Sequence, residues 1–211
     1  MRTLLCALLL APAVALAHPS TSARGAGNEA AGQDATEARR MFEAGRYQQV
    51  VNTAGDEAAP AVIYIAAQSH QKLGATEEAR AAYERLAARG EDDPWHFIGL
   101  SGQQLLADEA ATALESAQRA VALGPKLPDA HYQLGLVQAK RADWRSAAEA
   151  FDRASELSPG LAYAHYYGGL MHYRAGRPDR MAIHFEQFLK LAPEAPERPE
   201  VLQIMKTVRG R

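Results

Sequence analysis

Apolar residues recur at helical spacing along the chain from residue 34 onward. Leu134, Phe151 and Leu157 belong to an apolar stripe of this kind, with polar residues between them. Pro159 ends the stripe, because proline cannot continue a helix. The pattern therefore predicts an all-α fold made of short helices, with no β-sheet.

The helical pattern repeats with a period of 34 residues. The segments Ala130–Tyr132 and Ala164–Tyr166 are identical in sequence and lie 34 residues apart. The same offset relates four further pairs: Gly135 to Gly169, Phe151 to Phe185, Leu157 to Leu191 and Pro159 to Pro193. A fixed period of this length predicts stacked helix–turn–helix units.

Residues 128–159 show the period in its clearest form. Leu134-Gly135, Ala147, Phe151, Ala154 and Pro159 stand at the landmark positions of the tetratricopeptide repeat family, which the chain resembles. His131 and Gln138 depart from that pattern, since the family often has Trp and Tyr there. The resemblance implies an α-solenoid of stacked antiparallel helix pairs, a superhelix with a concave groove that binds protein partners.

The period also sets the expected domain boundaries. One shortened and four full repeats occupy residues 34–195, and residues 196–211 form a capping helix and the C-terminal tail. The expected cap has Val201, Leu202, Met205 and Val208 on one face. The full repeats are expected at Pro60–Asp93, Pro94–Leu127, Pro128–Leu161 and Ala162–Ala195.

The N-terminus has the features of a secretion signal. Arg2 precedes an apolar run that ends in Ala15-Leu16-Ala17, so residues 1–17 are expected to be a signal peptide. Retention of this run as an uncleaved anchor is the alternative. Cleavage would remove Cys6, the only cysteine, and no stable membrane insertion is expected afterwards. Residues 18–33 are expected to be a flexible linker, and the mature protein to be periplasmic if the source is a Gram-negative bacterium.

Composition narrows the choice of function. A net charge of −2 without a basic block argues against nucleic acid as a partner. No phosphate loop, nucleophile elbow or His-Glu-x-x-His helix is present, so we expect no enzyme and no cofactor. No metal site is expected either: His131 and His165 occupy equivalent slots of adjacent repeats, too far apart to share an ion. We interpret these two, His70 and His172 as rings packed between helices.

A ridge along the first helix of each repeat is the expected partner-binding groove. Its residues lie opposite the face that packs on the second helix, so we expect them on a concave surface. Packing against the next repeat is the alternative for part of this ridge. The expected groove residues are Tyr64, Gln68, Lys72, Trp95, Ile98, Tyr132, Leu136, Lys140, Tyr163, Tyr166, Leu170, Tyr173 and Arg174. Of these, Trp95, Tyr132, Tyr163, Tyr166 and Tyr173 are expected to be at least partly exposed.

The last full repeat departs most from the family pattern. Gly168-Gly169 lies inside a predicted helix, where each glycine costs ~1 kcal/mol relative to alanine. Met181 and Phe188 are larger than the alanines usual at their positions, and we expect them to fill the space that Gly168 leaves.

Two functions fit these expectations. The first is a non-catalytic scaffold or adaptor of the bacterial cell envelope, which binds a peptide or protein in the groove. The second is a permanent non-catalytic subunit or regulator of an envelope enzyme or of an export or assembly complex. An enzyme with an unrecognised site is a third and weaker candidate.

Overall fold

The computed structural model describes residues 21–209, and the side chains of residues 32–208. Within residues 21–209 the chain has eleven α-helices and no strand, as the apolar pattern predicts. The expected signal peptide, residues 1–17, lies outside the described part. The helices are α1 Thr21–Glu43, α2 Tyr47–Thr53, α3 Pro60–Lys72, α4 Thr76–Ala87, α5 Pro94–Leu106, α6 Ala110–Leu123, α7 Pro128–Lys140, α8 Trp144–Leu157, α9 Ala162–Arg174, α10 Pro178–Leu191 and α11 Arg198–Arg209.

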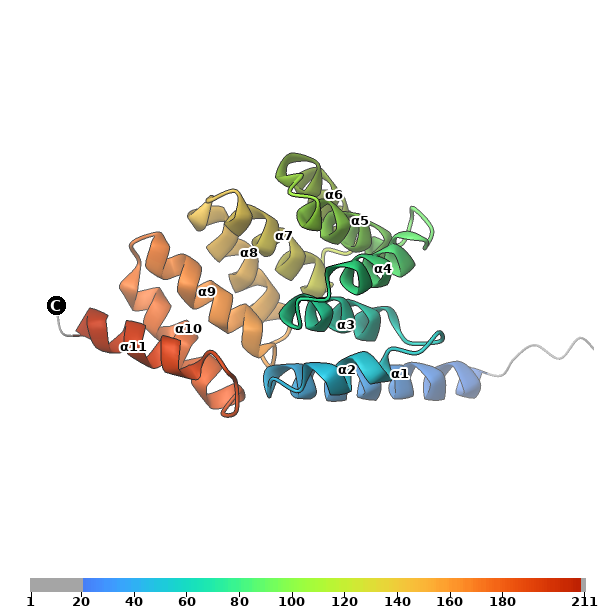
Figure 1. Cartoon of the computed structure of the whole chain (residues 1–211), viewed down its shortest axis with the longest axis horizontal. Coiled ribbons are helices and arrows are strands. Elements are labelled where there is room, and N and C mark those ends of the chain that lie inside the picture. Colours follow the sequence, from blue (N-terminus) through green and yellow to red (C-terminus); the bar gives the residue numbers. More distant parts are fainter. Residues whose placement is uncertain (1–20, 210–211) are drawn as a thin grey trace, which may run out of the picture.

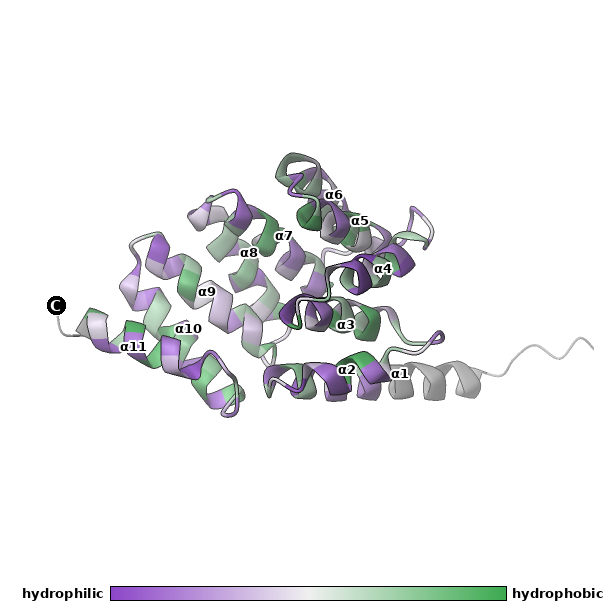
Figure 2. Cartoon of the chain, viewed as in Figure 1, coloured by the Kyte–Doolittle hydropathy of each residue, from purple (hydrophilic) through white to green (hydrophobic). Residues whose placement is uncertain are grey.

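Successive helices pack as antiparallel pairs that stack into a curved superhelix (Figure 1). Helices α3, α5, α7 and α9 begin at residues 60, 94, 128 and 162, each the first residue of an expected repeat. Proline opens α3, α5 and α7, where its missing N–H leaves no hydrogen bond unmade. Figure 2 shows hydrophilic and hydrophobic residues alternating along helices α2 to α11, as expected when one face of each helix is buried.

The turn inside each full repeat uses a left-handed residue at the same position. Gly74, Asp108, Ala142 and Gly176 are 34 residues apart in succession and have φ values of 75°, 62°, 60° and 72°. Glycine adopts this conformation without strain, whereas Asp108 and Ala142 carry a steric cost at Cβ. The turn geometry is therefore a property of the repeat, which the protein keeps even where the residue type disfavours it.

Helix α1 extends further toward the N-terminus than the sequence suggests. It begins at Thr21, so residues 21–33 of the expected flexible linker are helical, and residues 18–20 lie outside the described part. The C-terminal half of α1 packs on α2 and α3. Once that half is fixed, adding further turns to an alanine-rich segment avoids the cost of nucleating a new helix.

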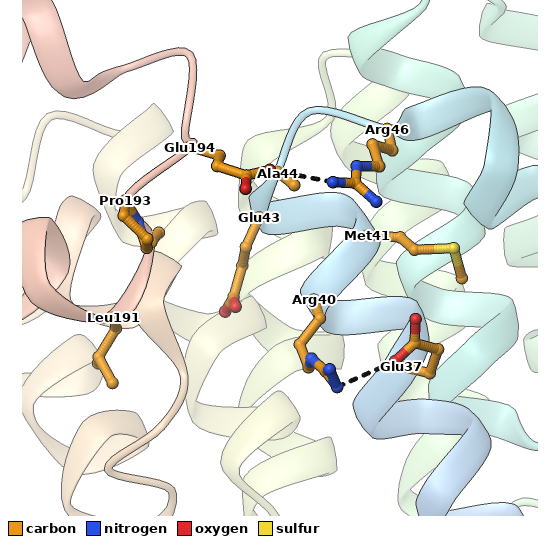
Figure 3. Close-up of a pocket in the computed structure, with 10 residues that line it drawn as sticks. Glu37, Arg40, Met41, Glu43, Ala44, Arg46, Leu191, Pro193 and Glu194 are labelled. Atoms are coloured by element: carbon orange, nitrogen blue, oxygen red, sulfur yellow. Dashed lines mark hydrogen bonds and ion pairs between the residues drawn. The ribbon is translucent and has the colours of Figure 1, made fainter.

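The superhelix curves so strongly that its first helix meets its last repeats. The loop between α1 and α2 lies beside the segment that follows α10, and a surface pocket marks this junction (Figures 1 and 3). Arg46 and Glu194 point toward each other across it, with 3.1 Å between Nη2 and Oε2 (Figure 3). The Glu43 carboxylate accepts a hydrogen bond of 3.1 Å from the backbone N–H of Ala162, the first residue of α9.

The space at Gly168 is filled differently from our expectation. A Cβ on Gly168 would lie 2.9 Å from Nδ1 of His184, and one on Gly169 would lie 2.4 Å from Cδ1 of Phe185. The rings of these two α10 residues therefore occupy the room beside the glycine pair. Met181 and Phe188 are buried in the common core, but they are not among the atoms closest to Gly168.

None of the described helices is both long enough and apolar enough to cross a membrane.

Candidate functional site

The expected exposure of the aromatic ridge is wrong for most of its members. Tyr132 and Tyr166 have relative exposures of 4% and 6%, and the other ridge residues that are buried are Tyr64, Ile98 and Tyr163. Trp95 is half-buried, and only Tyr173, at 38%, is an exposed aromatic of the ridge. The alternative of packing within the stack therefore applies to the centre of the ridge.

The tight curvature of the superhelix is the physical reason. First helices of distant repeats converge on the inner side, so that their inward-facing rings contact one another. Tyr132 lies edge-on to Tyr64 of α3 at 6.5 Å between ring centroids, and Phe42 of α1 contacts Tyr163 of α9 at 5.0 Å. Large aromatic pairs of this kind stabilise a core. A gently curved stack would leave the same residues facing solvent.

Residues near α11 complete the burial by accepting hydrogen bonds from the tyrosine hydroxyl groups. Tyr163 donates to Glu197 at 2.6 Å, and Tyr166 donates to Glu200 at 3.0 Å. Burial, followed by these carboxylates, raises the pKa of both tyrosines well above the usual value. Both phenols therefore stay neutral and act as donors that hold the C-terminal segment on the inner side.

Part of the expected groove remains open as a pocket on the inner side of α3, α5 and α7. Its volume is about 340 Å³, and we call it the inner pocket. It keeps Gln68, Lys72, Tyr132, Leu136 and Lys140 of the expected groove. The lining residues that the sequence did not indicate are Phe42, Gln71, Tyr83, Gly102, Leu105, Gln133 and Tyr167.

The other expected groove residues lie outside the inner pocket. The guanidinium of Arg174 lies over the ring of Trp144 in the neighbouring helix, 4.8 Å from the centroid. Tyr173 is exposed beside it on α9, and Leu170 is half-buried. Trp95 packs edge-on against Tyr64. The thirteen expected residues therefore do not form one continuous surface.

The inner pocket combines an apolar wall with amides and two lysines. Leu105, Leu136 and aromatic rings form the wall, and no residue of its lining is a carboxylate, a histidine or a serine. Lys72 Nζ lies 2.7 Å from Glu197 Oε1, and Lys140 Nζ lies 2.7 Å from Asp108 Oδ1. The pocket therefore offers hydrogen-bond donors and apolar contact but no pairing of nucleophile and base.

The amide groups differ in how fully they are used. Gln133 accepts from the hydroxyl of Tyr64 at 2.8 Å and donates to Ser101 Oγ at 3.0 Å. Gln71 accepts from the hydroxyl of Tyr83 at 2.9 Å. The Nε2 group of Gln68 is buried and has no hydrogen-bond partner. A buried donor without a partner is costly, so a ligand that supplies an acceptor there would relieve that cost.

A second polar cluster lies away from the inner pocket. Asp152 of α8, His172 of α9 and His184 of α10 come together, although only His172 was singled out in the sequence. His172 is buried, as expected of a ring packed between helices. Burial raises the pKa of Asp152, but hydrogen bonds from both histidines act in the opposite direction and hold it below its usual value.

The fold and the inner pocket define the class of protein: an α-helical repeat solenoid whose first helices line a concave binding surface. The tetratricopeptide repeat model matches residues 61–89, and the chain is a tetratricopeptide repeat protein. No curated protein matches the chain in sequence.

Two solved structures illustrate the likeness in fold. TTC0263, a thermophilic tetratricopeptide repeat protein of Thermus thermophilus, is 18% identical, with 84% of this chain and 97% of that chain covered and a TM-score of 0.59. YrrB, a tetratricopeptide repeat protein with an unusual peptide-binding site, is 20% identical, with 88% and 97% covered and a TM-score of 0.50. Proteins of this family are generally non-catalytic scaffolds for protein interaction.

Proposed function

We propose that this protein is a non-catalytic adaptor of the bacterial cell envelope that binds a peptide segment of a partner protein in the inner pocket. The unpartnered amide of Gln68 carries the proposal, because it sits in the wall of a concave pocket and requires an acceptor. Peptide carbonyl groups and side-chain carboxylates are such acceptors. The tetratricopeptide fold supports a binding role in general, and the peptide-binding site of YrrB shows that one protein of this fold binds peptides.

The lining indicates the chemistry of the segment. Leu105 and Leu136 favour one or two aliphatic side chains, and Lys72 and Lys140 favour a carboxylate near them. Each lysine already pairs with a carboxylate of the chain itself, so an acidic ligand would compete with Glu197 and Asp108. We therefore propose a short segment with a central apolar residue and a flanking acidic group.

The envelope location rests on the N-terminal sequence. Residues 1–17 combine a positive start, an apolar run and the small-residue ending Ala15-Leu16-Ala17. Cleavage after Ala17 would release a mature chain without cysteine, which folds by packing alone in an oxidising compartment. The proposed place of action is the periplasm.

The adaptor is favoured over a permanent subunit by the burial of the tyrosine ridge. A permanent subunit was expected to leave an apolar ridge exposed when purified alone. Tyr64, Tyr132, Tyr163 and Tyr166 are instead covered within the chain. The purified mature protein is accordingly expected to be monomeric in analytical ultracentrifugation, and self-association would favour the subunit.

In-cell photocrosslinking tests the proposal. A photoreactive residue at Gln71, in the inner pocket, is expected to capture a protein that the same residue at exposed Glu115 of α6 does not capture. Lys140→Glu is expected to weaken that capture, whereas Lys126→Glu, the same charge change at an exposed position outside the pocket, leaves it unchanged. Equal capture from both positions, or equal effects of both charge reversals, would rule out the inner pocket as the binding site.

A further inference from the structure

Three consecutive helices direct metal-ligating atoms at one point. The Nε2 atoms of His172 in α9 and His184 in α10 each lie 2.9 Å from the same atom, Oδ1 of Asp152 in α8. All three ligand atoms lie within 4.8 Å of one another. Both histidine rings are buried, while the Asp152 side chain keeps 24% of its exposure and gives the cluster a path to solvent.

A fourth residue settles where the proton of His184 lies. His165 Nε2 is 3.2 Å from the carbonyl oxygen of Pro159, and only an N–H group can make that contact. In a neutral His165 ring Nδ1 then has no hydrogen and must accept. His184 Nδ1, 3.3 Å away, is the donor to it. A neutral His184 therefore has its lone pair on Nε2.

That assignment places two acceptors face to face. The lone pair of His184 Nε2 points at a carboxylate oxygen 2.9 Å away, which is unfavourable unless a cation lies between them. A proton can join two of the three atoms. A metal ion can join all three, because His172 Nε2 converges on the same oxygen from another helix.

We propose that Asp152, His172 and His184 form a binding site for a divalent transition-metal ion of the zinc type. Two imidazole nitrogens and one carboxylate oxygen are a usual three-ligand set for zinc, and water at the exposed edge of Asp152 takes the fourth position. Atoms around a tetrahedral zinc ion are spaced by about 3.3 Å, so the ligands move apart by only a few tenths of an ångström. Metal uptake displaces the proton of His172 Nε2, while His184 Nε2 binds through its lone pair.

His165 serves as the supporting residue of this site. Its contact with His184 Nδ1 fixes the tautomer in which Nε2 is free to bind the metal. Gly168 contributes by lacking a side chain, since a Cβ there would lie 2.9 Å from the His184 ring. The glycine inside α9 thus leaves space for a ligand, and the ion would tie together helices α8, α9 and α10.

Titration of the metal-free full chain with Zn²⁺ tests the site. We expect one ion bound per chain by isothermal titration calorimetry, a higher thermal midpoint in its presence, and weaker binding at pH 5.5 than at pH 7.5, because the imidazoles must be unprotonated to bind. Asp152→Asn and His184→Gln keep the size of each side chain and are expected to weaken Zn²⁺ binding at least about tenfold.

A matched control separates this site from adventitious binding by surface histidines. His131 makes the same kind of contact one repeat earlier, with Nε2 3.0 Å from the carbonyl of Pro125, so His131→Ala is expected to leave Zn²⁺ binding unchanged. The visible spectrum of the Co²⁺ form, read on variants whose circular dichroism matches the parent, is expected to show tetrahedral coordination that Asp152→Asn abolishes. No saturable binding, or binding equally strong in Asp152→Asn, would overturn the proposal and leave a proton as the shared cation.

Discussion

Arg39 of α1 and Asp129 of α7 form an ion pair across the inner side of the superhelix, although 90 residues separate them in sequence. The Nη2 group of Arg39 lies 2.7 and 2.9 Å from the two carboxylate oxygens of Asp129. With the junctions from Glu43 to Ala162 and from Arg46 to Glu194, this pair joins the start of the stack to its later repeats. The inner side is consequently closed around its tyrosines rather than open along its whole length.

Arg39→Ala is expected to destabilise the protein by about 3 kcal/mol. Asp129 is buried, and removal of the arginine would leave its charge without a partner in a poorly solvated place. Arg40→Ala, at the next residue, removes an exposed ion pair with Glu37 and is expected to change stability by less than about 1 kcal/mol. Urea unfolding followed by circular dichroism measures both, and equal effects would show that the long-range pair contributes little.

Glu43 is expected to make the protein less stable as the pH rises. Burial raises the pKa of its carboxyl to about 7, against 4.5 for the free group, although the Ala162 hydrogen bond acts in the opposite direction. The folded state therefore binds more protons than the unfolded state between these values, so stability falls as pH increases through that window. The full cost above pH 7 is roughly 3 kcal/mol.

Glu43→Gln isolates this effect. Glutamine keeps an oxygen to accept the Ala162 N–H but cannot ionise, so the variant is expected to exceed the parent in stability at pH 8 and to match it near pH 4. Glu37→Gln, at an exposed position of the same helix, serves as the control and should leave the pH profile of the parent unchanged. Denaturant midpoints measured from pH 4 to pH 8 decide between the two profiles.

Ala142→Gly is expected to raise stability by about 0.5–1 kcal/mol. Ala142 has a φ of 60°, which strains an alanine, while the equivalent residues Gly74 and Gly176 avoid the strain. Ala81→Gly, at an exposed position inside α4, is expected to lower stability by about 1 kcal/mol. Opposite shifts of the thermal midpoint would confirm the turn effect, and a loss in both variants would contradict it.

The repeat and its helices could be predicted from the sequence, because local landmarks determine them. Pro128 and Pro159 delimit a helix pair, and the period of 34 carries that information to the neighbouring repeats. The phase of each helix was also correct, since Gly135 faces Phe151 of the next helix. Curvature, however, is a sum of small rotations between repeats, and no single residue indicates it.

The errors at the candidate site follow from that missing curvature. Tyr132 does point away from the second helix of its repeat, but in a tightly curved stack this direction leads to Tyr64 of α3 rather than to solvent. The histidine cluster was missed for a related reason. His172 and His184 meet through antiparallel packing of α9 on α10, and Asp152 joins them from α8, whereas equivalent positions in successive repeats do not meet.

The C-terminal helix α11 is expected to act as a cap that protein stability requires. Val201 is fully buried, whereas the adjacent Leu202 is half exposed. Val201→Asp would place a charge against the last repeat and is expected to lower the thermal midpoint by several degrees, while Leu202→Asp has little effect. Removal of residues 200–211 also deletes Glu200, the acceptor for Tyr166, and should reduce stability or solubility. A truncated chain as stable and monomeric as the parent would show that α11 is not a cap.

Tyr132→Ala and Tyr173→Ala, two substitutions in the same sequence-derived ridge, are expected to have opposite consequences. Tyr132 is buried between Tyr64, Phe151 and Tyr167, so truncation leaves a cavity and should cost about 3–5 kcal/mol of stability. Tyr173 is exposed and lies outside the inner pocket, so its truncation should cost less than about 1 kcal/mol and leave partner capture from Gln71 unchanged. Thermal unfolding and crosslinking yield, measured on both variants, separate the two roles. If Tyr132→Ala kept full stability and lost only partner capture, the ring would belong to an open binding surface, and the closed inner side described above would be wrong.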